Sequence, residues 1–284
     1  MTFSSNDEHV IKHEWTYFEV TAAAPVGAVT ANAAPTVPDF PPSTDILWCT
    51  HVMIREAGGD PDQFPLDIRI GGEVMRTIGI ESAVLDNFTR TASASTWGTS
   101  TSGNAWTNTG GVAADHYTTG TEGAHRLTAV DVARLDLVAI SGTDALVQAD
   151  IATAALATGG PQLVSLATRA VDGDNCYLAQ LSISTAAVIT LTIRKRAAGV
   201  ETELGSYTTA LTHTAFGFFR LQLQSVGSEH KARVWPVAAL APDWQVEVSE
   251  GALVTGSNVG CRSVRQTANT NTNLIVSWDN FEVL

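Results

Sequence analysis

Two pairs of acidic residues in this sequence come close to a catalytic arrangement. Glu201 and Glu203 alternate in "GVETEL", and Glu247 and Glu250 lie close together in "VEVSE". A glycoside hydrolase needs two carboxyl groups that flank the scissile bond, one as the acid and the other as the nucleophile or base. The first pair directly follows a predicted hairpin turn, and strand alternation places Glu247 and Glu250 on opposite faces. We therefore expect exposed carboxylates here and a protein that is not an enzyme.

The other reactive side chains do not form a known catalytic motif. The segment "GTSTSG" (98–103) lacks the spacing of a nucleophile elbow. His9 and His13 stand four residues apart beside Glu14. Because no third ligand follows at a usable spacing, we expect a solvent-exposed pair there rather than a metal site. Four further histidines are isolated in the sequence, and each is expected to be exposed or hydrogen-bonded: His116, His125, His213 and His230.

The segment "VDGDN" has the composition of a metal-binding loop. It gathers Asp172, Asp174 and Asn175 on a predicted turn, and these oxygen ligands could bind Ca²⁺. The alternative is a β-turn that uses Asp, Gly and Asn for their backbone preferences. We favour the turn because a calcium site needs six or more oxygen ligands. We expect no other cofactor.

A second segment combines aromatic and polar side chains that suit a sugar. Aromatic rings with a polar edge, beside planar polar groups, are typical of such sites. The run "AADHYTTGTEGAHR" (113–126) and the tryptophan upstream offer both. We expect glycan contacts from Trp97, Asp115, His116 and Tyr117. Three other tryptophans occur in strand-like runs and are predicted to be buried: Trp106, Trp235 and Trp278.

The composition bears on partners and on the folding compartment. The net charge of −13 over 284 residues disfavours binding to nucleic acid or to an anionic membrane. No apolar run approaches the roughly 18 residues that span a bilayer, so we expect no membrane insertion. Cys49, Cys176 and Cys261 are too few and too far apart for a disulfide framework, which suits folding in a reducing cytoplasm. The start "MTFSSNDEH" predicts no secretory signal.

The first 84 residues differ in kind from the rest. Residues 21–44 contain five of the ten prolines and show no periodicity, so we assign 1–45 to an extended arm or linker. The stretch "FPLDIRIGGEVMRTIGI" (64–80) alternates on both sides of Gly71-Gly72. Two alternating runs around two glycines predict a two-residue hairpin, and we assign 46–84 to a β-hairpin module.

Residues 85–284 show a uniformly β pattern. Short runs of β-branched and apolar residues are separated by Gly, Asn, Asp or Ser, with no sustained period of 3.6. This pattern predicts an all-β antiparallel sandwich or barrel. The triplet Asp-Asn-Phe occurs at 86–88 and again at 279–281. Because a sandwich can protect its edges by pairing its first strand with its last, we predict that these two strands lie side by side.

The segment "LDNFTRTASASTWGTSTSGNAWTNTGG" (85–111) resembles the opening of concanavalin A-like, laminin-G-like jelly rolls in tail proteins of phages that infect actinobacteria. The likeness is carried by Asp86, Phe88, Arg90, Trp97, Gly98, Ser102, Gly103 and Trp106. A short module of minor tail proteins from the same phages is matched by Gly71, Gly72, Glu73 and Met75. The resemblance implies a concanavalin A-like jelly roll over 85–284.

The resemblance also implies a place in a virion, assembled in the host cytoplasm and released by lysis. We expect a non-enzymatic component of the tail or tail fibre, whose residues 1–84 contact other virion proteins. A homo-oligomer follows as an expectation, and three-fold symmetry is usual for a fibre. The jelly roll would bind a host-surface glycan. Two alternatives stay open: a capsid decoration or head-fibre protein, and a cell-wall polysaccharide hydrolase.

Overall fold

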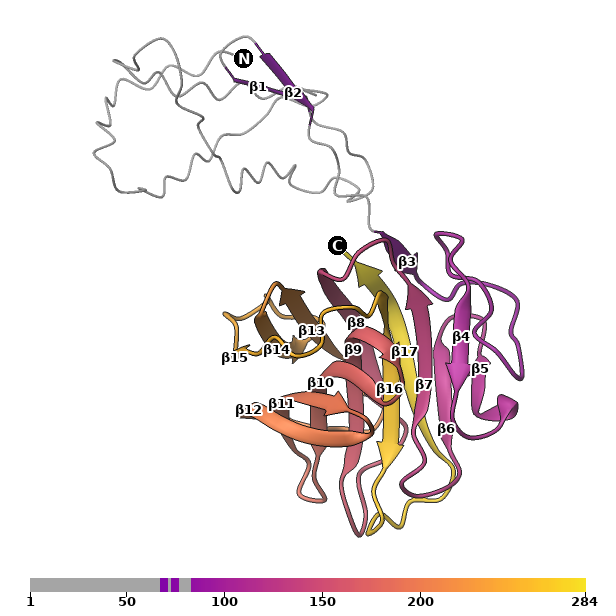
Figure 1. Ribbon diagram of the computed structural model, residues 1–284. Coiled ribbons are helices and arrows are strands. Elements are labelled where there is room, and N and C mark those ends of the chain that lie inside the picture. The colour runs from indigo at the N-terminus through magenta and orange to yellow at the C-terminus, as the bar shows by residue number, and fades with distance from the viewer. Residues whose placement is uncertain (1–66, 71–72, 77–82) are drawn as a thin grey trace. The chain divides into compact units, whose positions relative to one another are not determined.

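The computed structural model describes residues 67–70, 73–76 and 83–284 (Figure 1). The chain divides into two compact units, Met1–Glu81 and Ser82–Leu284. In the first unit, β1 (Asp67–Ile70) pairs antiparallel with β2 (Glu73–Arg76), and Ile70 lies opposite Glu73. This register leaves two residues between the strands, so the predicted hairpin is confirmed. The predicted arm, 1–45, and the apolar run that follows it lie outside the described residues.

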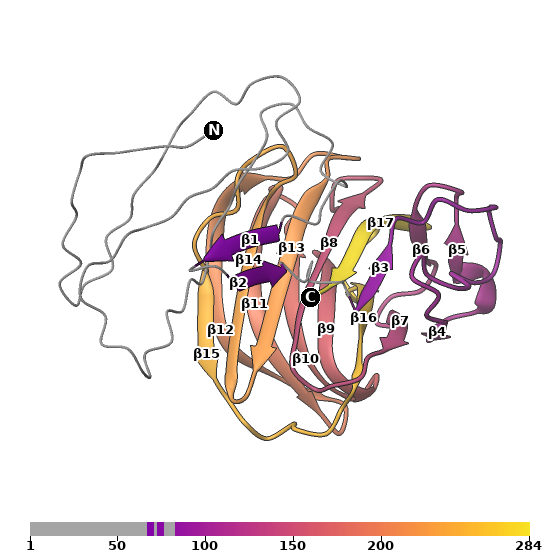
Figure 2. The same cartoon turned by 90° about the horizontal axis from the view of Figure 1, so that it is seen from above.

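The second unit is an antiparallel sandwich of two sheets (Figures 1 and 2). The seven-stranded sheet has the order β12 (Val200–Thr212), β11 (Val188–Ala197), β10 (Asn175–Ile183), β9 (Gln162–Asp172), β16 (Asn258–Arg265), β7 (Arg134–Ala139) and β4 (Trp106–Thr109). The eight-stranded sheet has the order β15 (Val246–Ser249), β14 (Glu229–Pro236), β13 (Phe219–Val226), β8 (Ala145–Thr153), β17 (Leu274–Val283), β6 (Gly123–Leu127) and β5 (His116–Thr118), with β3 (Val84–Asp86) also paired to β17. The predicted all-β jelly-roll sandwich is confirmed.

Helical structure is minimal in the described residues. A single turn of 3-10 helix, η1 (Ala113–Asp115), precedes β5. Within residues 67–70, 73–76 and 83–284, no helix has the length and apolar character needed to cross a bilayer.

The core lies between the two sheets because side chains alternate along each strand. In β13, for example, Phe219, Leu221 and Leu223 are buried in the core, whereas Arg220 and Gln224 are half-exposed on the other face. The tryptophans predicted to be buried are buried: Trp106, Trp235 and Trp278. Each strand therefore has an inner face in the core and an outer face that can carry polar groups.

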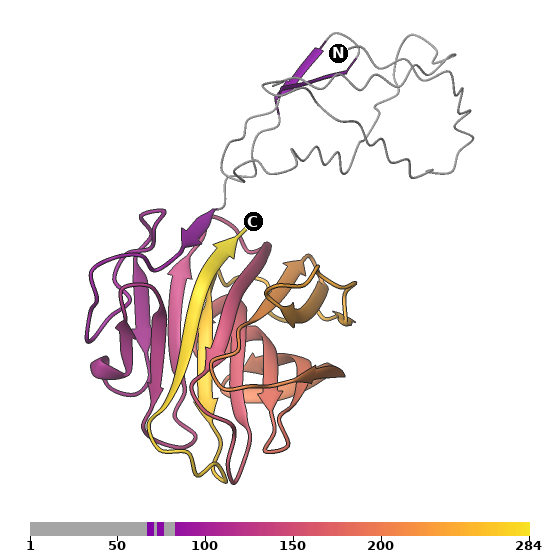
Figure 3. The same cartoon turned by 180° about the vertical axis from the view of Figure 1, so that it is seen from behind.

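The two Asp-Asn-Phe strands do lie side by side. Along one edge β17 pairs with β8, and along the other it pairs first with β6 and then with β3 (Figure 3). Phe281 stands opposite Asp86 in this antiparallel register. The sequence-based prediction that the first and last strands of the domain pair is confirmed.

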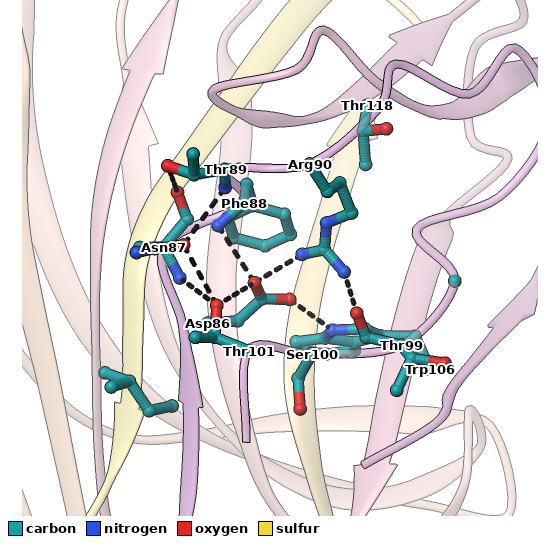
Figure 4. Close-up of polar contacts among 12 residues, drawn as sticks. Asp86, Asn87, Phe88, Thr89, Arg90, Thr99, Ser100, Thr101, Trp106 and Thr118 are labelled. Atoms are coloured by element: carbon teal, nitrogen blue, oxygen red, sulfur yellow. Dashed lines mark hydrogen bonds and ion pairs between the residues drawn. The ribbon is translucent and has the colours of Figure 1, made fainter. Parts of the chain in front are cut away.

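Asp86 explains much of the motif that begins the domain. Its buried carboxylate accepts hydrogen bonds from the Trp106 indole N–H at 2.7 Å and from the Phe88 backbone N–H at 2.9 Å, and it forms an ion pair with Arg90 (Figure 4). The Arg90 guanidinium also donates to the carbonyl of Thr99. A buried carboxylate requires such partners to offset its desolvation. Asp86 thus ties β3 to the start of β4 and, through Arg90, to the loop that precedes β4.

Candidate functional site

A β-bulge in β17 shapes the outer face of the eight-stranded sheet. Asp279 pairs with Asp150 and Glu282 with Gln148, so Asn280 and Phe281 together oppose a single residue of β8. Phe281 enters the core, and Asn280 is exposed with a φ of 48°. Asparagine tolerates this left-handed conformation better than most residues. The bulge therefore directs two consecutive polar side chains, Asp279 and Asn280, to the outer face.

These two side chains line a hollow of about 260 Å³, here called the bulge hollow. It is formed by Thr121, Glu122, Asp150, Phe218, Val237, Asp279 and Asn280. Asn280 Nδ2 donates to Asp150 Oδ2 at 2.9 Å, and the Arg220 guanidinium holds both Asp150 oxygens at 2.6 and 2.8 Å. The hollow thus combines an aromatic ring with polar groups in fixed positions.

The acidic groups of the bulge hollow differ in their surroundings. Burial raises the pKa of Asp279, a hydrogen bond from the Asn280 backbone opposes this rise, and the charge of Asp150 adds to it. Asp150 itself is neutralised by its two-pronged contact with Arg220. The surroundings of Asp279 therefore favour its protonated form relative to an exposed aspartate.

Planar polar side chains continue from the hollow across the same face. Gln148 donates to Glu282 at 2.6 Å and accepts from Gln222 at 3.2 Å, and Arg233 donates to Gln222 at 2.6 Å. The Arg233 guanidinium also lies 4.3 Å from the ring centre of Trp244, which is half-exposed. The outer face from β17 to β14 is thus a connected polar surface with an indole ring at one side.

A second hollow, here called the hairpin hollow, lies on the β5–β6 hairpin. Its volume is about 480 Å³ and its lining is Ala92, Ser93, Ala94, Ala114, Tyr117, Thr118, Thr119 and Arg126. The Arg126 guanidinium stacks on the Tyr117 ring at 5.0 Å. Tyr117 is half-exposed, so this predicted glycan-binding residue lies where a ligand can reach it.

The other three predicted glycan-binding residues are buried, which corrects the prediction for them. Trp97 and His116 have no exposed surface, and Asp115 is 2% exposed. Trp97 donates its indole N–H to the Ala124 carbonyl at 3.2 Å and stacks on His125. Asp115 is paired with Arg134 at 2.8 Å. A side chain without accessible surface cannot stack on a sugar, so these residues stabilise the fold beneath the hairpin hollow.

The turn between β9 and β10 does not fit a calcium ion. Asp172 Oδ1 accepts hydrogen bonds from the Asp174 backbone at 2.8 Å and from the Asn175 amide at 3.0 Å. Asp174 is paired with Arg196 at 2.8 Å, and Asn175 Oδ1 accepts from the Ala198 backbone. These contacts hold the oxygen atoms in a turn and leave fewer oxygen ligands than the six that Ca²⁺ requires. The β-turn interpretation fits this geometry.

The two acidic pairs considered first are tied to cations. Glu201 contacts Arg194, Arg196 and Arg262 at 2.9 to 3.2 Å. Glu203 contacts Arg194, Glu247 contacts Lys231, and Glu250 contacts Lys195. These ion pairs hold the carboxylates against basic side chains of the strands in the same sandwich, as expected for structural contacts.

Sequence reasoning named two histidines singly but missed the cluster that they form with a buried aspartate in the core. His116, His125 and Asp136 place three ligand-type atoms within 4.8 Å of one another, the one such group among the described residues. Asp150 and Asn280 of the bulge hollow were also missed. Asp150 lies in the run "ALVQADIA", where a polar residue between apolar ones was the available signal for an outward-facing position.

Comparisons with known proteins gave matches among solved structures alone. No protein-family model matches the sequence, and no curated protein matches it. Among solved structures, the carbohydrate-binding module CBM66 from Bacillus subtilis is 16% identical, with a TM-score of 0.44 over 62% of this chain and 92% of that chain. The VIP36 exoplasmic/lumenal domain in its Ca²⁺/Man3GlcNAc-bound form is 12% identical, with a TM-score of 0.40 over 63% and 83%. A β-1,3-glucanase from Mycobacterium marinum is 12% identical, with a TM-score of 0.41 over 72% and 98%.

Proposed function

We propose that the jelly-roll domain binds carbohydrate, without catalysing a reaction, on the outer face of its eight-stranded sheet. The observation that carries this proposal is the makeup of the bulge hollow. Phe218 supplies an apolar ring beside the carboxylate of Asp279 and the amide of Asn280, and the buried Asp150 holds that amide in place. Small-ligand sites typically combine apolar walls with a few convergent polar groups.

The chemistry of these groups suits the hydroxyl groups of a sugar. Ionised carboxylates accept hydrogen bonds only, whereas an amide both donates and accepts. Asn280 is exposed, and its amide is held by Asp150 through the bulge. Part of the ordering cost of binding is therefore already met in the free protein. The half-exposed rings of Tyr117 and Trp244 offer further contacts for a longer glycan.

A glycan array followed by titration calorimetry tests this function. Phe218→Ala and Asp279→Asn should each weaken binding of the array hit at least tenfold. Tyr207→Ala is a matched control, because Tyr207 is an exposed aromatic residue on β12 of the other sheet. Failure to bind any glycan, or equal binding by the wild type and both hollow variants, would contradict the proposal.

Polysaccharide hydrolysis is a second candidate, and one observation favours it. Asp279 and Asp150 are cross-strand neighbours in the bulge hollow, and the pKa of Asp279 is raised, mainly by burial. Glycosidases use one carboxylic acid that stays protonated beside one carboxylate. The contacts of Asp150 with Arg220 and Asn280 leave it poorly free to act as a nucleophile or base, so we favour binding alone. Release of reducing sugar that disappears in Asp279→Asn would reverse this preference.

We also propose that the domain is displayed on a phage particle, most simply on its tail, as a homo-oligomer attached through residues 1–84. The support is the sequence resemblance of 85–284 and of the hairpin around Gly71 and Gly72. Mass spectrometry of purified particles and light scattering of the purified chain test these two points. Absence of the chain from particles would contradict the first, and a monomeric full-length chain would contradict the second.

A further inference from the structure

Three fully buried side chains connect the two sheets beneath the hairpin hollow. Asp136 belongs to β7 of the seven-stranded sheet, while His116 and His125 face each other on β5 and β6 of the other sheet. Asp136 Oδ2 lies 2.5 Å from His116 Nδ1 and 2.7 Å from His125 Nε2. One carboxylate oxygen thus holds both strands of the hairpin.

The partners of His116 fix its protonation state. Its Nε2 lies 2.7 Å from the Gly110 carbonyl oxygen, which can only accept a hydrogen bond. Its Nδ1 faces the Asp136 carboxylate, which also accepts when it is ionised. Both ring nitrogens must therefore carry a proton, and His116 is an imidazolium.

The partners of His125 dictate the opposite state. The indole N–H of Trp278 can only donate, and it points at His125 Nδ1 at 3.3 Å. Nδ1 must therefore be an acceptor. The Ser263 hydroxyl, 2.9 Å away, then donates to the same nitrogen. The proton of the neutral ring lies on Nε2 and is donated to Asp136. His125 is a neutral histidine beside a charged one.

The electrostatics agree with this assignment. Burial opposes the charge of His116, but the hydrogen bond and the charge of Asp136 outweigh it and raise the pKa of His116. Burial dominates at His125 and lowers its pKa. Burial also opposes the charge of Asp136, but the two histidine hydrogen bonds prevail and lower its pKa.

The neighbouring charged and titratable groups are largely compensated. Arg134 of β7 disfavours a charge on either histidine, and it is paired with Asp115 of η1. Cys261 of β16 pairs in register with Asp136, and burial raises its pKa so that it stays a neutral thiol. Asp86 lies close enough to act on Cys261, and it is itself paired with Arg90. The imidazolium therefore has Asp136 as its main counter-charge.

A metal ion is a poorer occupant of this cluster than protons. Zinc at its usual ligand distances would hold the ligand atoms about 3.3 Å apart, whereas these pairs lie at 2.5 and 2.7 Å. His125 Nε2 also carries the proton that a metal would displace. The distances and the indole donor therefore both favour hydrogen bonds.

We propose that His116, Asp136 and His125 form a proton-operated clasp that holds the β5–β6 hairpin onto the seven-stranded sheet. Loss of the His116 proton to solvent at high pH leaves one of its two acceptors unmatched. Gain of a proton by His125 at low pH turns Nδ1 into a donor against the Trp278 indole. Either event removes a hydrogen bond in a dry interior and loosens the hairpin.

The clasp would also regulate ligand binding, a consequence that rests on the proposed function. The same hairpin supplies Tyr117 and Arg126 to the hairpin hollow, and its turn supplies Thr121 and Glu122 to the bulge hollow. Loosening the hairpin therefore displaces walls of both hollows at once. We expect glycan affinity to fall by at least threefold outside the pH range in which the clasp is closed.

Nitrogen-detected NMR of histidine side chains in the full chain tests the clasp without any glycan. At pH 6.5, His116 should show two protonated nitrogens and His125 a proton on Nε2 only. Hydrogen exchange, corrected for intrinsic rates, should show residues 116–127 losing protection before β8 and β13 as the pH rises. A neutral His116 at pH 6.5, or a His125 spectrum altered by Zn²⁺ or EDTA, would overturn the proposal.

Variants separate the clasp from its consequence. His116→Gln should abolish the loss of hairpin protection at high pH, whereas His230→Gln, which changes a buried histidine on β14, should retain it. If His116→Gln does not fold, the wild-type spectra decide alone. If the wild-type spectra show the predicted protonation states but glycan affinity does not vary with pH, the regulatory role is refuted and the clasp itself is supported.

Discussion

Asn280 donates its side-chain amide to Asp150 at 2.9 Å from the bulged position of β17. The contact joins two neighbouring strands on the outer face and fixes one wall of the bulge hollow. It depends on a backbone φ of 48° at Asn280, a conformation that most side chains adopt only at a cost. Backbone geometry and candidate site are therefore coupled at this residue.

Asn280→Ala should destabilise the domain by about 1–2 kcal/mol, because it loses the hydrogen bond and strains the left-handed backbone. Asn280→Gly should cost less, since glycine adopts this conformation freely. Urea unfolding of both variants measures the difference. Equal stability of Asn280→Ala and the wild type would show that the bulge does not depend on this side chain.

Asp86→Ala should destabilise the domain by about 3–5 kcal/mol, because it leaves the charge of Arg90 and the indole N–H of Trp106 without their shared buried partner. Asp243→Ala, at an exposed position, is the control and should change stability by less than about 0.5 kcal/mol. Thermal and urea unfolding provide the comparison. Similar losses for the two variants would contradict the role of Asp86.

Stability should fall on both sides of about pH 6.5. His116 has a raised pKa, so its contribution is complete below the unfolded value of 6.5 and is lost as the pH rises through the folded value. Burial lowers the pKa of His125, His213 and His230 in the folded state. As the pH falls below 6.5, these histidines gain protons in the unfolded state first, and the folded state therefore loses stability. Asp136, whose pKa is lowered, adds a loss below its unfolded value of 3.8.

Urea midpoints measured between pH 4 and pH 9 test this curve. His116→Gln should flatten the alkaline side and leave the acid side, because the other histidines remain. An alkaline side of unchanged slope in His116→Gln would show that another group causes it.

The thiols of Cys176 and Cys261 should be unreactive in the folded domain. Both are fully buried, and burial raises the pKa of Cys176 to about 12. The thiolate is the reactive form. In a Cys49→Ser background, an aromatic disulfide reagent should therefore label less than a tenth of a thiol per chain until urea is added. Rapid labelling without urea would mean that the sandwich opens.

The sequence was sufficient for the strands and insufficient for the site. Alternation and turn residues predicted the sandwich and the Gly71-Gly72 hairpin, because each is a local property of the chain. The pairing of the two Asp-Asn-Phe strands was also predicted, from the need to close a sheet. Trp97 lies outside any alternating run, so the sequence pattern could not predict that its side chain is buried in the core.

The composition of the hollows and of the clasp depends on long-range register. His116 and Asp136 belong to different sheets, and Asp150 and Asn280 are 130 residues apart. Nothing in the local pattern of β17 predicts an inserted residue at the bulge. Tyr117 was placed correctly on an accessible surface, while its neighbours Asp115 and His116 are buried.

An amide chemical-shift titration shows whether the outer face of the eight-stranded sheet binds a glycan. With the array hit added to labelled full-length protein, the largest shifts should map to Phe218, Asp279 and Asn280. The amides of β11 and β12 should stay unchanged. Shifts confined to those two strands, or no shifts at all with glycans from the array, would contradict glycan binding at the outer face.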